Sequence, residues 1–159
     1  GKPRTLDEVC PQCFTQPLAP PEAAAAEGKS VNLDLLYSGA EVWQENCDLL
    51  LIEGAGGLFS PLADGVLNLD LARKLDAEVV LVTANRLGVI HQVLATCRAA
   101  AHAGIRISGI FFSCPDSSED GSQPSNPDQV AHYCDVPILG VVPHRGGPEH
   151  VAGIDRLLR

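Results

Sequence analysis

The stretch Glu78-Val79-Val80-Leu81-Val82-Thr83 decides the class of fold, because it is a short, continuous apolar run rich in β-branched residues. Runs of this kind are typical of strands that are buried on both faces of a parallel sheet. Three similar runs occur in the 159-residue chain, at 48–52 before this stretch and at 106–112 and 137–142 after it. We therefore predict four buried strands.

Helical patterns separate these apolar runs. One pattern covers about residues 68–75, a second covers 88–103, and a third follows Pro127. Within the second, apolar residues recur at helical spacing, namely Ile90, Leu94, Cys97 and Ala101. Strands that alternate with helices predict an α/β domain with a parallel sheet covered by helices. Ligands bind such sheets beyond the carboxyl ends of the strands, so functional residues should follow each run directly.

Proline positions and helical patterns indicate how the rest of the chain is organised. Residues 1–30 form an irregular, Pro-rich lead-in, in which a short helix is expected after Pro20-Pro21. Residues 32–46 predict an amphipathic helix. We expect the α/β domain to occupy residues 31–147 and residues 148–159 to form a helical tail.

Composition excludes several classes of partner. The net charge of -9 disfavours nucleic acid and anionic membranes, which select clustered Lys and Arg. No apolar run approaches the roughly 18 to 20 residues that span a bilayer, and no secretory signal is visible. The six cysteines are interpreted as reduced thiols of a cytoplasmic protein. Cys10 and Cys13 form a CxxC, but no second CxxC or His pair stands at zinc spacing, which disfavours a metal or redox role.

The strongest functional feature is Glu53-Gly54-Ala55-Gly56-Gly57, which directly follows the 48–52 run. A carboxylate at a strand end can hold Mg²⁺ beside nucleotide phosphates. The small residues permit close backbone approach, and their N–H groups can face an anion. A Gly-rich turn with a solvated Glu explains the same residues equally well, so the pattern leaves both interpretations open.

Two further segments follow predicted strands. Leu87-Gly88-Val89-Ile90-His91 opens a helix, whose amino end favours a carboxylate or phosphate, although an ordinary connection is the simpler interpretation. Pro143-His144-Arg145 follows the last run and either flanks a nucleotide base or simply turns the chain.

Gly28-Lys29-Ser30 imitates the end of a Walker A phosphate loop. The full motif requires a second Gly five residues before Gly28, and residue 23 is Ala. A hydrophobic strand should also precede the loop, whereas Pro-Pro-Glu and an alanine run stand there. We therefore do not expect Lys29 to bind phosphate.

Together these motifs resemble the dethiobiotin synthetases from about Val9 to Gly147. The matching blocks, in the family's order, are Phe14–Ala24, Glu53–Gly57 with Pro61-Leu62 and Asp64, Leu87-Gly88-x-Ile90, and Gly140–Pro143. Each block is weak alone, whereas four in order at family-like spacing are specific. The resemblance implies a three-layer P-loop NTPase-like fold, a parallel sheet with helices on both faces, here lacking the first strand and the P-loop.

The resemblance also implies a reaction of biotin synthesis. Carbon dioxide and 7,8-diaminopelargonic acid form a carbamate, ATP phosphorylates it, and the second amine closes the ring. A homodimer and Mg²⁺ are implied, with Glu53 as metal ligand and with Gly54, Ala55 and Gly56 along the phosphates of ATP. The residues implied to contact adenine are Ser113, Cys114, Pro143, His144 and Arg145. Those implied to receive the substrate carboxylate, in one subunit or across the dimer, are Leu87, Gly88, Val89, Ile90 and His91.

Three departures from the family pattern qualify this resemblance. The Walker A loop, a catalytic Lys and a Mg²⁺-binding Asp have no counterpart here, so no catalytic residue is assigned. His91-Gln92 replaces the family's Asn-His, and Ser113-Cys114 replaces an adenine-contacting Asn. We expect that this polypeptide alone does not turn over ATP and that its sheet exposes an apolar edge. A cobyrinate-diamide-synthase-like ATPase and a non-catalytic nucleotide-binding or dimerising remnant are the alternatives.

Overall fold

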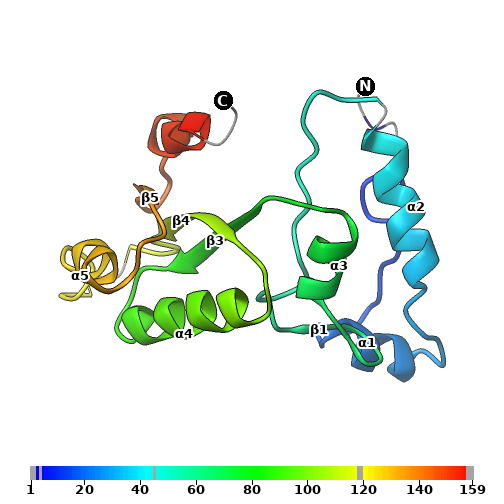
Figure 1. The fold of residues 1–159 in the computed structure, drawn as a ribbon. Coiled ribbons are helices and arrows are strands. Elements are labelled where there is room, and N and C mark those ends of the chain that lie inside the picture. The colour runs from blue at the N-terminus through cyan, green and yellow to red at the C-terminus, as the bar shows by residue number, and fades with distance from the viewer. Residues whose placement is uncertain (1–2, 4, 45, 118–119, 157–159) are drawn as a thin grey trace. The chain divides into compact units, whose positions relative to one another are not determined.

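The structure is a computed structural model that describes residues 3, 5–44, 46–117 and 120–156. Figure 1 shows the chain, which divides into two compact units, Gly1–Ala77 and Glu78–Arg159. Among the described residues, no helix is both long enough and apolar enough to cross a membrane.

The second unit is built on a parallel sheet in the order β3-β4-β5. Its strands are β3 (Val79–Ala84), β4 (Ile107–Ser113) and β5 (Ile138–Val142), which confirms three of the predicted strands and the α/β class. The central strand β4 is buried from residue 107 to 112, as its unbroken apolar run predicts for a strand covered on both faces.

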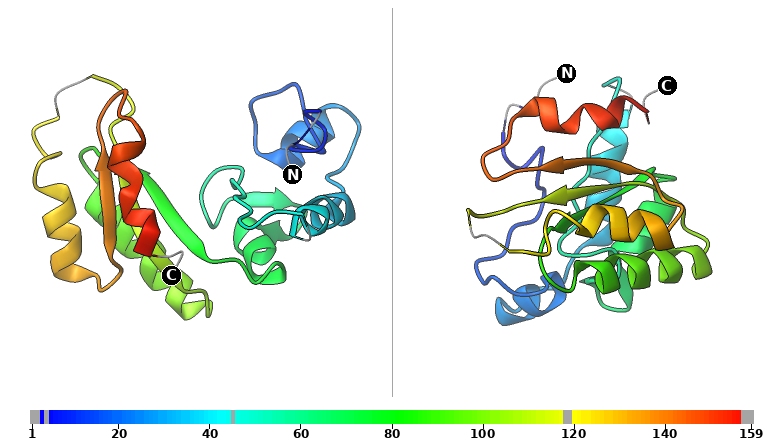
Figure 2. Two further views of the ribbon diagram at one scale, coloured as in Figure 1. Left: turned by 90° about the horizontal axis from the view of Figure 1, so that it is seen from above. Right: turned by 90° about the vertical axis from the view of Figure 1, so that its left-hand side faces the viewer.

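Two helices lie side by side on one face of this sheet, as Figure 2 shows. They are α4 (Val89–His102) and α5 (Asn126–Tyr133), which confirms the helices predicted at 88–103 and after Pro127. The helix α4 buries Val89, Val93, Cys97 and Ala100. This spacing places the four side chains on one helical stripe. The predicted stripe of Ile90, Leu94, Cys97 and Ala101 is wrong by one residue at three positions, because Ile90 and Leu94 are only partly buried and Ala101 is exposed.

A 3-10 helix, η1 (Pro148–Arg156), packs along β5 (Figure 2). Two glycines permit the close approach. A Cβ atom on Gly153 would overlap the backbone carbonyl of Leu139, and one on Gly140 would lie 2.6 Å from the backbone oxygen of His150. The backbones of η1 and β5 therefore touch directly, with no side chain between them at these positions.

The first unit contains three helices and a short antiparallel hairpin. Its elements are α1 (Pro20–Ala26), α2 (Leu33–Gln44), β1 (Pro61–Ala63), β2 (Val66–Leu67) and α3 (Asn68–Lys74), which confirms the three helices predicted in this region. Its core is small and consists of Ala23, Ala24, Leu62, Ala63 and Leu69. The helix α1 packs against β1, which holds the lead-in on the hairpin.

The prediction of a strand at 48–52 is wrong, because the structure forms no strand there. Leu49, Leu51 and Ile52 are 51%, 75% and 45% exposed. A strand forms only where a neighbour accepts and donates its ladder hydrogen bonds. In the described part of Gly1–Ala77 the only strands are β1 and β2, and these pair with each other.

We predict that Gly153→Ala destabilises the chain, because the added methyl group collides with the carbonyl of Leu139 and backbone cannot yield as a side chain would. The expected loss of unfolding free energy is about 1 to 3 kcal/mol, measured by urea denaturation. Gly121→Ala is the control, since a Cβ atom there meets nothing within 4 Å. Equal stability of the two variants would show that η1 is not packed tightly on β5.

Candidate functional site

The three strands of the second unit end together at one edge of the sheet. The strand register pairs Ala84 with Ser113 and Ser113 with Val142, so the three final residues are neighbours. The loops that follow therefore leave from a single edge. This is the edge at which open parallel sheets bind their ligands.

Residues predicted to flank adenine lie after β4 and β5 on this edge. The backbone N–H of Cys114 donates to the carbonyl of Val142 over 2.8 Å. The Nδ1 atom of His144 lies 3.0 Å from the carbonyl oxygen of Pro115 and can donate to it. These contacts tie the loop after β5 to the loop after β4, so the structure brings Ser113, Cys114 and 143–145 together.

The turn after β5 has a defined shape. The N–H of Gly146 donates to the carbonyl of Pro143 over 2.8 Å. Arg145 adopts a left-handed backbone with φ of 57°, which is uncommon for a residue with a side chain. Pro143, His144 and Arg145 are all exposed, so their side chains are available to a ligand at this edge.

The segment predicted to bind the substrate carboxylate divides into exposed and buried residues. Gly88 has φ of 92° and immediately precedes α4, a conformation that glycine adopts without strain. Leu87 is 81% exposed, and His91 is exposed, whereas Val89 is 0% exposed and belongs to the core. The Val89 side chain therefore anchors the helix in the core and is not available to a ligand.

A buried asparagine pair, which the sequence patterns do not reveal, fixes the loop after β3. Asn85 and Asn126 are each 2% exposed, and the Asn126 Nδ2 atom donates to Asn85 Oδ1 over 2.8 Å. Asn85 also donates its Nδ2 hydrogen to the carbonyl of Gln123 over 3.1 Å and its backbone N–H to that of Ser113 over 2.7 Å. Because buried amides need such partners, the pair locks the β3–α4 loop to β4 and to the start of α5.

The charged carboxylate of Asp120 also holds this loop, through hydrogen bonds. Its carboxylate accepts hydrogen bonds from the backbone N–H of Leu87 over 2.6 Å and from the N–H and hydroxyl of Ser122 over 2.9 and 2.7 Å. The bonds from Ser122, followed by that from Leu87, lower the pKa of Asp120. The carboxylate therefore stays charged at neutral pH and holds Leu87, directly before the α4 amino end.

The Gly-rich loop 53–60 lies in the first unit and is organised around Asn68. Asn68 is 7% exposed, and its Nδ2 group donates to the carbonyls of Ala55 and Gly57, each over 2.9 Å. Gly56 has φ of 83°, and a Cβ atom there would lie 2.8 Å from Ser60 Oγ. The loop thus requires glycine at position 56 and is shaped by a side chain that motif reasoning did not single out.

Glu53 begins this loop and is exposed. Its carboxylate is a hard oxygen donor of the type that Mg²⁺ selects. Among the described residues, no group of three or more His, Cys, Asp or Glu side chains could hold a metal ion. A metal role for Glu53 stays a prediction.

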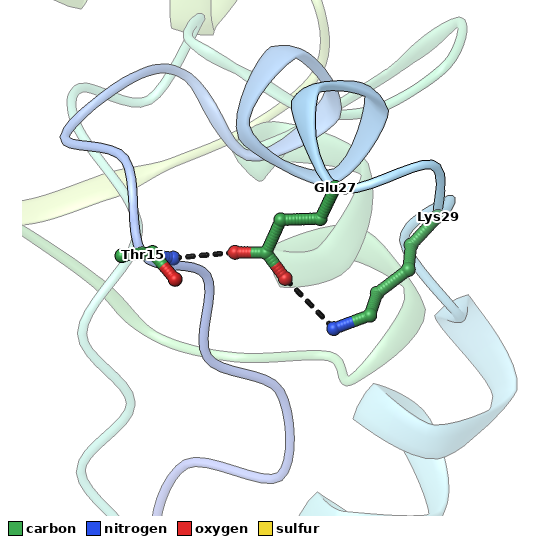
Figure 3. A network of polar contacts seen from close by, with 3 residues as sticks. All are labelled: Thr15, Glu27 and Lys29. Atoms are coloured by element: carbon green, nitrogen blue, oxygen red, sulfur yellow. Dashed lines mark hydrogen bonds and ion pairs between the residues drawn. The ribbon is translucent and has the colours of Figure 1, made fainter.

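Lys29 pairs with a carboxylate next to it, as Figure 3 shows. Its Nζ atom lies 2.7 Å from Glu27 Oε2, and Glu27 Oε1 accepts the backbone N–H of Thr15 over 2.6 Å. These contacts, first the one from Lys29, lower the pKa of Glu27 to about 2. Glu27 thus links the end of α1 to the lead-in, and Lys29 is held beside it in an ion pair.

The fold and the strand-end edge define a P-loop NTPase-like α/β protein, and a family profile described as an AAA domain matches residues 1–148. The chain is also similar to the ATP-dependent dethiobiotin synthetase BioD of Rhodopirellula baltica, with 40% identity over 93% of this chain and 62% of the relative. The BioD of Bacillus licheniformis is 36% identical over 89% of this chain and 60% of the relative. That of Aromatoleum aromaticum is 36% identical over 96% of this chain and 68% of the relative.

The chain belongs to the dethiobiotin synthetase family. It spans about 60% of the length of the first two of these relatives.

We predict that Asn126→Ala destabilises the second unit by about 1 to 3 kcal/mol, the cost of a buried polar group that loses its partner. The affected group is Asn85 Oδ1, which accepts from Asn126. Urea denaturation measures the loss, and hydrogen exchange should show faster exchange at the Asn85 amide. Gln129→Ala, at an exposed position of the same helix, is the control. A loss of stability in Gln129→Ala without a loss in Asn126→Ala would contradict the role assigned to Asn126.

We predict that the stability advantage of the wild type over Glu27→Gln depends on pH. The folded pKa of Glu27 lies below its ordinary value of 4.5, at about 2. The advantage is therefore fully present above the ordinary value and disappears as the pH falls toward the folded value. Urea midpoints of both proteins across this range measure the difference. An advantage that grows as the solution is acidified would contradict the ion pair.

Proposed function

We propose that this chain supplies the adenine-, metal- and substrate-contacting segments of an ATP-dependent dethiobiotin synthetase. Membership of the family supports the proposal. The observation that carries it is the alignment of Ala84, Ser113 and Val142 at one sheet edge, from which the three loops with proposed ligand residues begin. Their order along the chain and their placement on one edge are both what a nucleotide-binding α/β sheet requires.

The edge after β4 and β5 suits an adenine base. Ser113 offers a hydroxyl group, and the loop 143–145 offers the flat faces of Pro143 and His144 with the cation of Arg145 beside them. A planar guanidinium can stack on an aromatic base. Ser113 makes fewer hydrogen bonds than the Asn of the family pattern, so we propose that Cys114 and the loop backbone supply the remaining contacts.

The amino end of α4 suits a carboxylate. The helix is 14 residues long, and the N–H groups at a helix amino end can receive an anion. Asp120 and the buried asparagine pair hold the preceding loop. Because the N–H of Leu87 is bonded to Asp120 and that of Val89 to the carbonyl of Arg86, we assign the anion to the N–H groups of Gly88, Ile90 and His91. We propose that Gly88–His91 receives the carboxylate of diaminopelargonate, within a homodimer as the family implies.

Glu53 is proposed as the Mg²⁺ ligand, with Gly54, Ala55 and Gly56 along the phosphates. The exposed carboxylate fits one position of a Mg²⁺ ion that is completed by phosphate and water oxygens. The ion would neutralise charge on the phosphates during transfer. The chain's own contribution is to place the Glu53 carboxylate at the start of a loop whose shape the hydrogen bonds from Asn68 maintain.

We propose further that the polypeptide alone does not turn over ATP. Phosphoryl transfer depends on cations placed around the phosphates, and the sequence contains no complete Walker A motif and only three lysines. Lys29 pairs with Glu27, and the Lys74 ammonium lies 5.7 Å from the centre of the Tyr37 ring. Lys2 falls outside the described residues. A phosphate loop from outside this sequence would complete the site.

A chimaera tests the proposal. The matching segment of the Rhodopirellula baltica relative, 40% identical to this chain, is replaced by residues 1–159, and dethiobiotin formation is measured with ATP, Mg²⁺, bicarbonate and diaminopelargonate. We expect the chimaera to form dethiobiotin and the isolated chain to form none. A folded chimaera without activity would overturn the proposal.

Glu53→Gln in the chimaera is expected to lower the rate of ring closure roughly 10- to 100-fold, the loss typical of disturbed metal sites. The loss should shrink as the Mg²⁺ concentration rises, because a weakened site fills at higher metal concentration. Glu41→Gln, which removes an exposed carboxylate from α2, is the control. Unchanged activity in Glu53→Gln would remove Glu53 from the mechanism.

A further inference from the structure

The lead-in of the first unit carries two exposed thiols at contact distance. The Sγ atoms of Cys10 and Cys13 lie 3.6 Å apart, with Cys13 oriented to donate its S–H hydrogen to the Cys10 sulfur. Both side chains are open to solvent. Two accessible thiols in this arrangement can react with one another through a small-molecule intermediate.

The segment that holds these thiols is braced on α2. Gln12, between the two cysteines, exchanges two hydrogen bonds with the backbone of Asn32, over 2.8 and 2.7 Å. The indole N–H of Trp43 donates to the carbonyl of Glu8 over 3.0 Å. The N–H of Cys10 donates to the carbonyl of Leu6 over 2.8 Å. Because the chain is tied down before Cys10 and again between the two cysteines, the sulfur atoms are held near one another by the fold.

A metal site does not account for the pair. Structural zinc takes four protein ligands, and the described residues contain no group of three or more His, Cys, Asp or Glu side chains that could hold an ion. Two thiols without further donors match the requirement for disulfide formation, which needs two sulfur atoms and an oxidant.

We propose that Cys10 and Cys13 form a redox-active thiol pair that low-molecular-weight disulfides convert reversibly into an intramolecular disulfide. The Cys10 thiolate attacks the small disulfide RSSR, forms a mixed disulfide and releases one RS⁻. The Cys13 thiolate then attacks the Cys10 sulfur and expels the second RS⁻. In total the two cysteines lose two electrons and two protons, and RSSR becomes two RSH.

The hydrogen bond within the pair sets this order of attack. The bond to Cys10, followed by the charge of a Cys10 thiolate, raises the pKa of Cys13. The raised pKa makes Cys13 a poor first nucleophile, since the thiolate is the reactive form. Once Cys10 is capped, that restraint is gone, and Cys13 is placed to resolve the mixed disulfide.

The other cysteines of the chain are less suited to this reaction. Cys97 is buried, and burial followed by its contact with Cys134 raises the pKa of its thiol to about 12. Cys47 is half-buried and donates to the carbonyl of Trp43 over 3.0 Å. Since the thiolate is the reactive form, these thiols should react with a small disulfide more slowly than the exposed pair.

Tryptic mapping tests the proposal on the intact chain. The folded protein is equilibrated with mixtures of oxidised and reduced glutathione, free thiols are alkylated, and the digest is analysed by mass spectrometry. Cleavage after Arg4 and Lys29 gives a peptide, Thr5–Lys29, that contains Cys10 and Cys13 and no other cysteine. We expect this peptide to be unalkylated and two hydrogens lighter than its dithiol form. Treatment with dithiothreitol should restore the dithiol form.

Two matched variants establish the roles of the sulfurs. Cys13→Ser should accumulate a glutathione adduct on Cys10, whereas Cys10→Ser should carry far less adduct on Cys13. Gln12→Ala removes the brace to Asn32 and should require a more oxidising mixture for half conversion. Thr5–Lys29 remaining doubly alkylated in the folded chain overturns the proposal. So does a cross-link between the peptides of Cys97 and Cys134 that appears before the Thr5–Lys29 disulfide.

Discussion

The backbone ladder of β4 is the interaction on which the described site of the second unit depends. Because β4 pairs with β3 on one side and with β5 on the other, its register decides where both neighbours end. Because residues 107–112 are buried on both faces, a slip of one residue would exchange the side chains of the two faces and force both to repack. The ladder thereby brings together three loops that are separated by about 25 to 30 residues in the sequence.

The elements that the sequence predicts correctly are those whose local pattern and long-range partners agree. The runs at 78–83, 106–112 and 137–142 become strands because each has a neighbour in the sheet. The run at 48–52 is equally apolar, but it finds no ladder partner among the described residues, and Leu49, Leu51 and Ile52 are exposed. An apolar pattern indicates that burial of a segment is favoured. Strand formation also requires a second strand as a hydrogen-bonding partner, which the pattern of one segment cannot reveal.

The candidate site divides in the same way. Glycine motifs can be recognised in the sequence, because glycine marks positions such as Gly56 and Gly88 where the backbone has positive φ. The asparagines that hold these loops are not readable, since Asn85 and Asn126 lie 41 residues apart and neither stands in a motif. Asparagine in a loop is ordinary in sequence, and only its burial distinguishes a structural amide from a solvated one.

The two loops with proposed ligand roles share one design. Asn68 donates to carbonyls of the Gly-rich loop, and Asn85 donates to a carbonyl of the segment before α5. A neutral amide satisfies backbone carbonyls without adding charge, so it leaves the electrostatic field at the loop to the ligand, to Glu53 and to the helix terminus. A lysine or arginine in the same place would hold the carbonyls but would also compete with Mg²⁺ for the phosphates. Neutral anchors at these positions therefore suit the nucleotide and carboxylate ligands that we propose, because the amides add no charge of their own beside the groups proposed to contact those ligands.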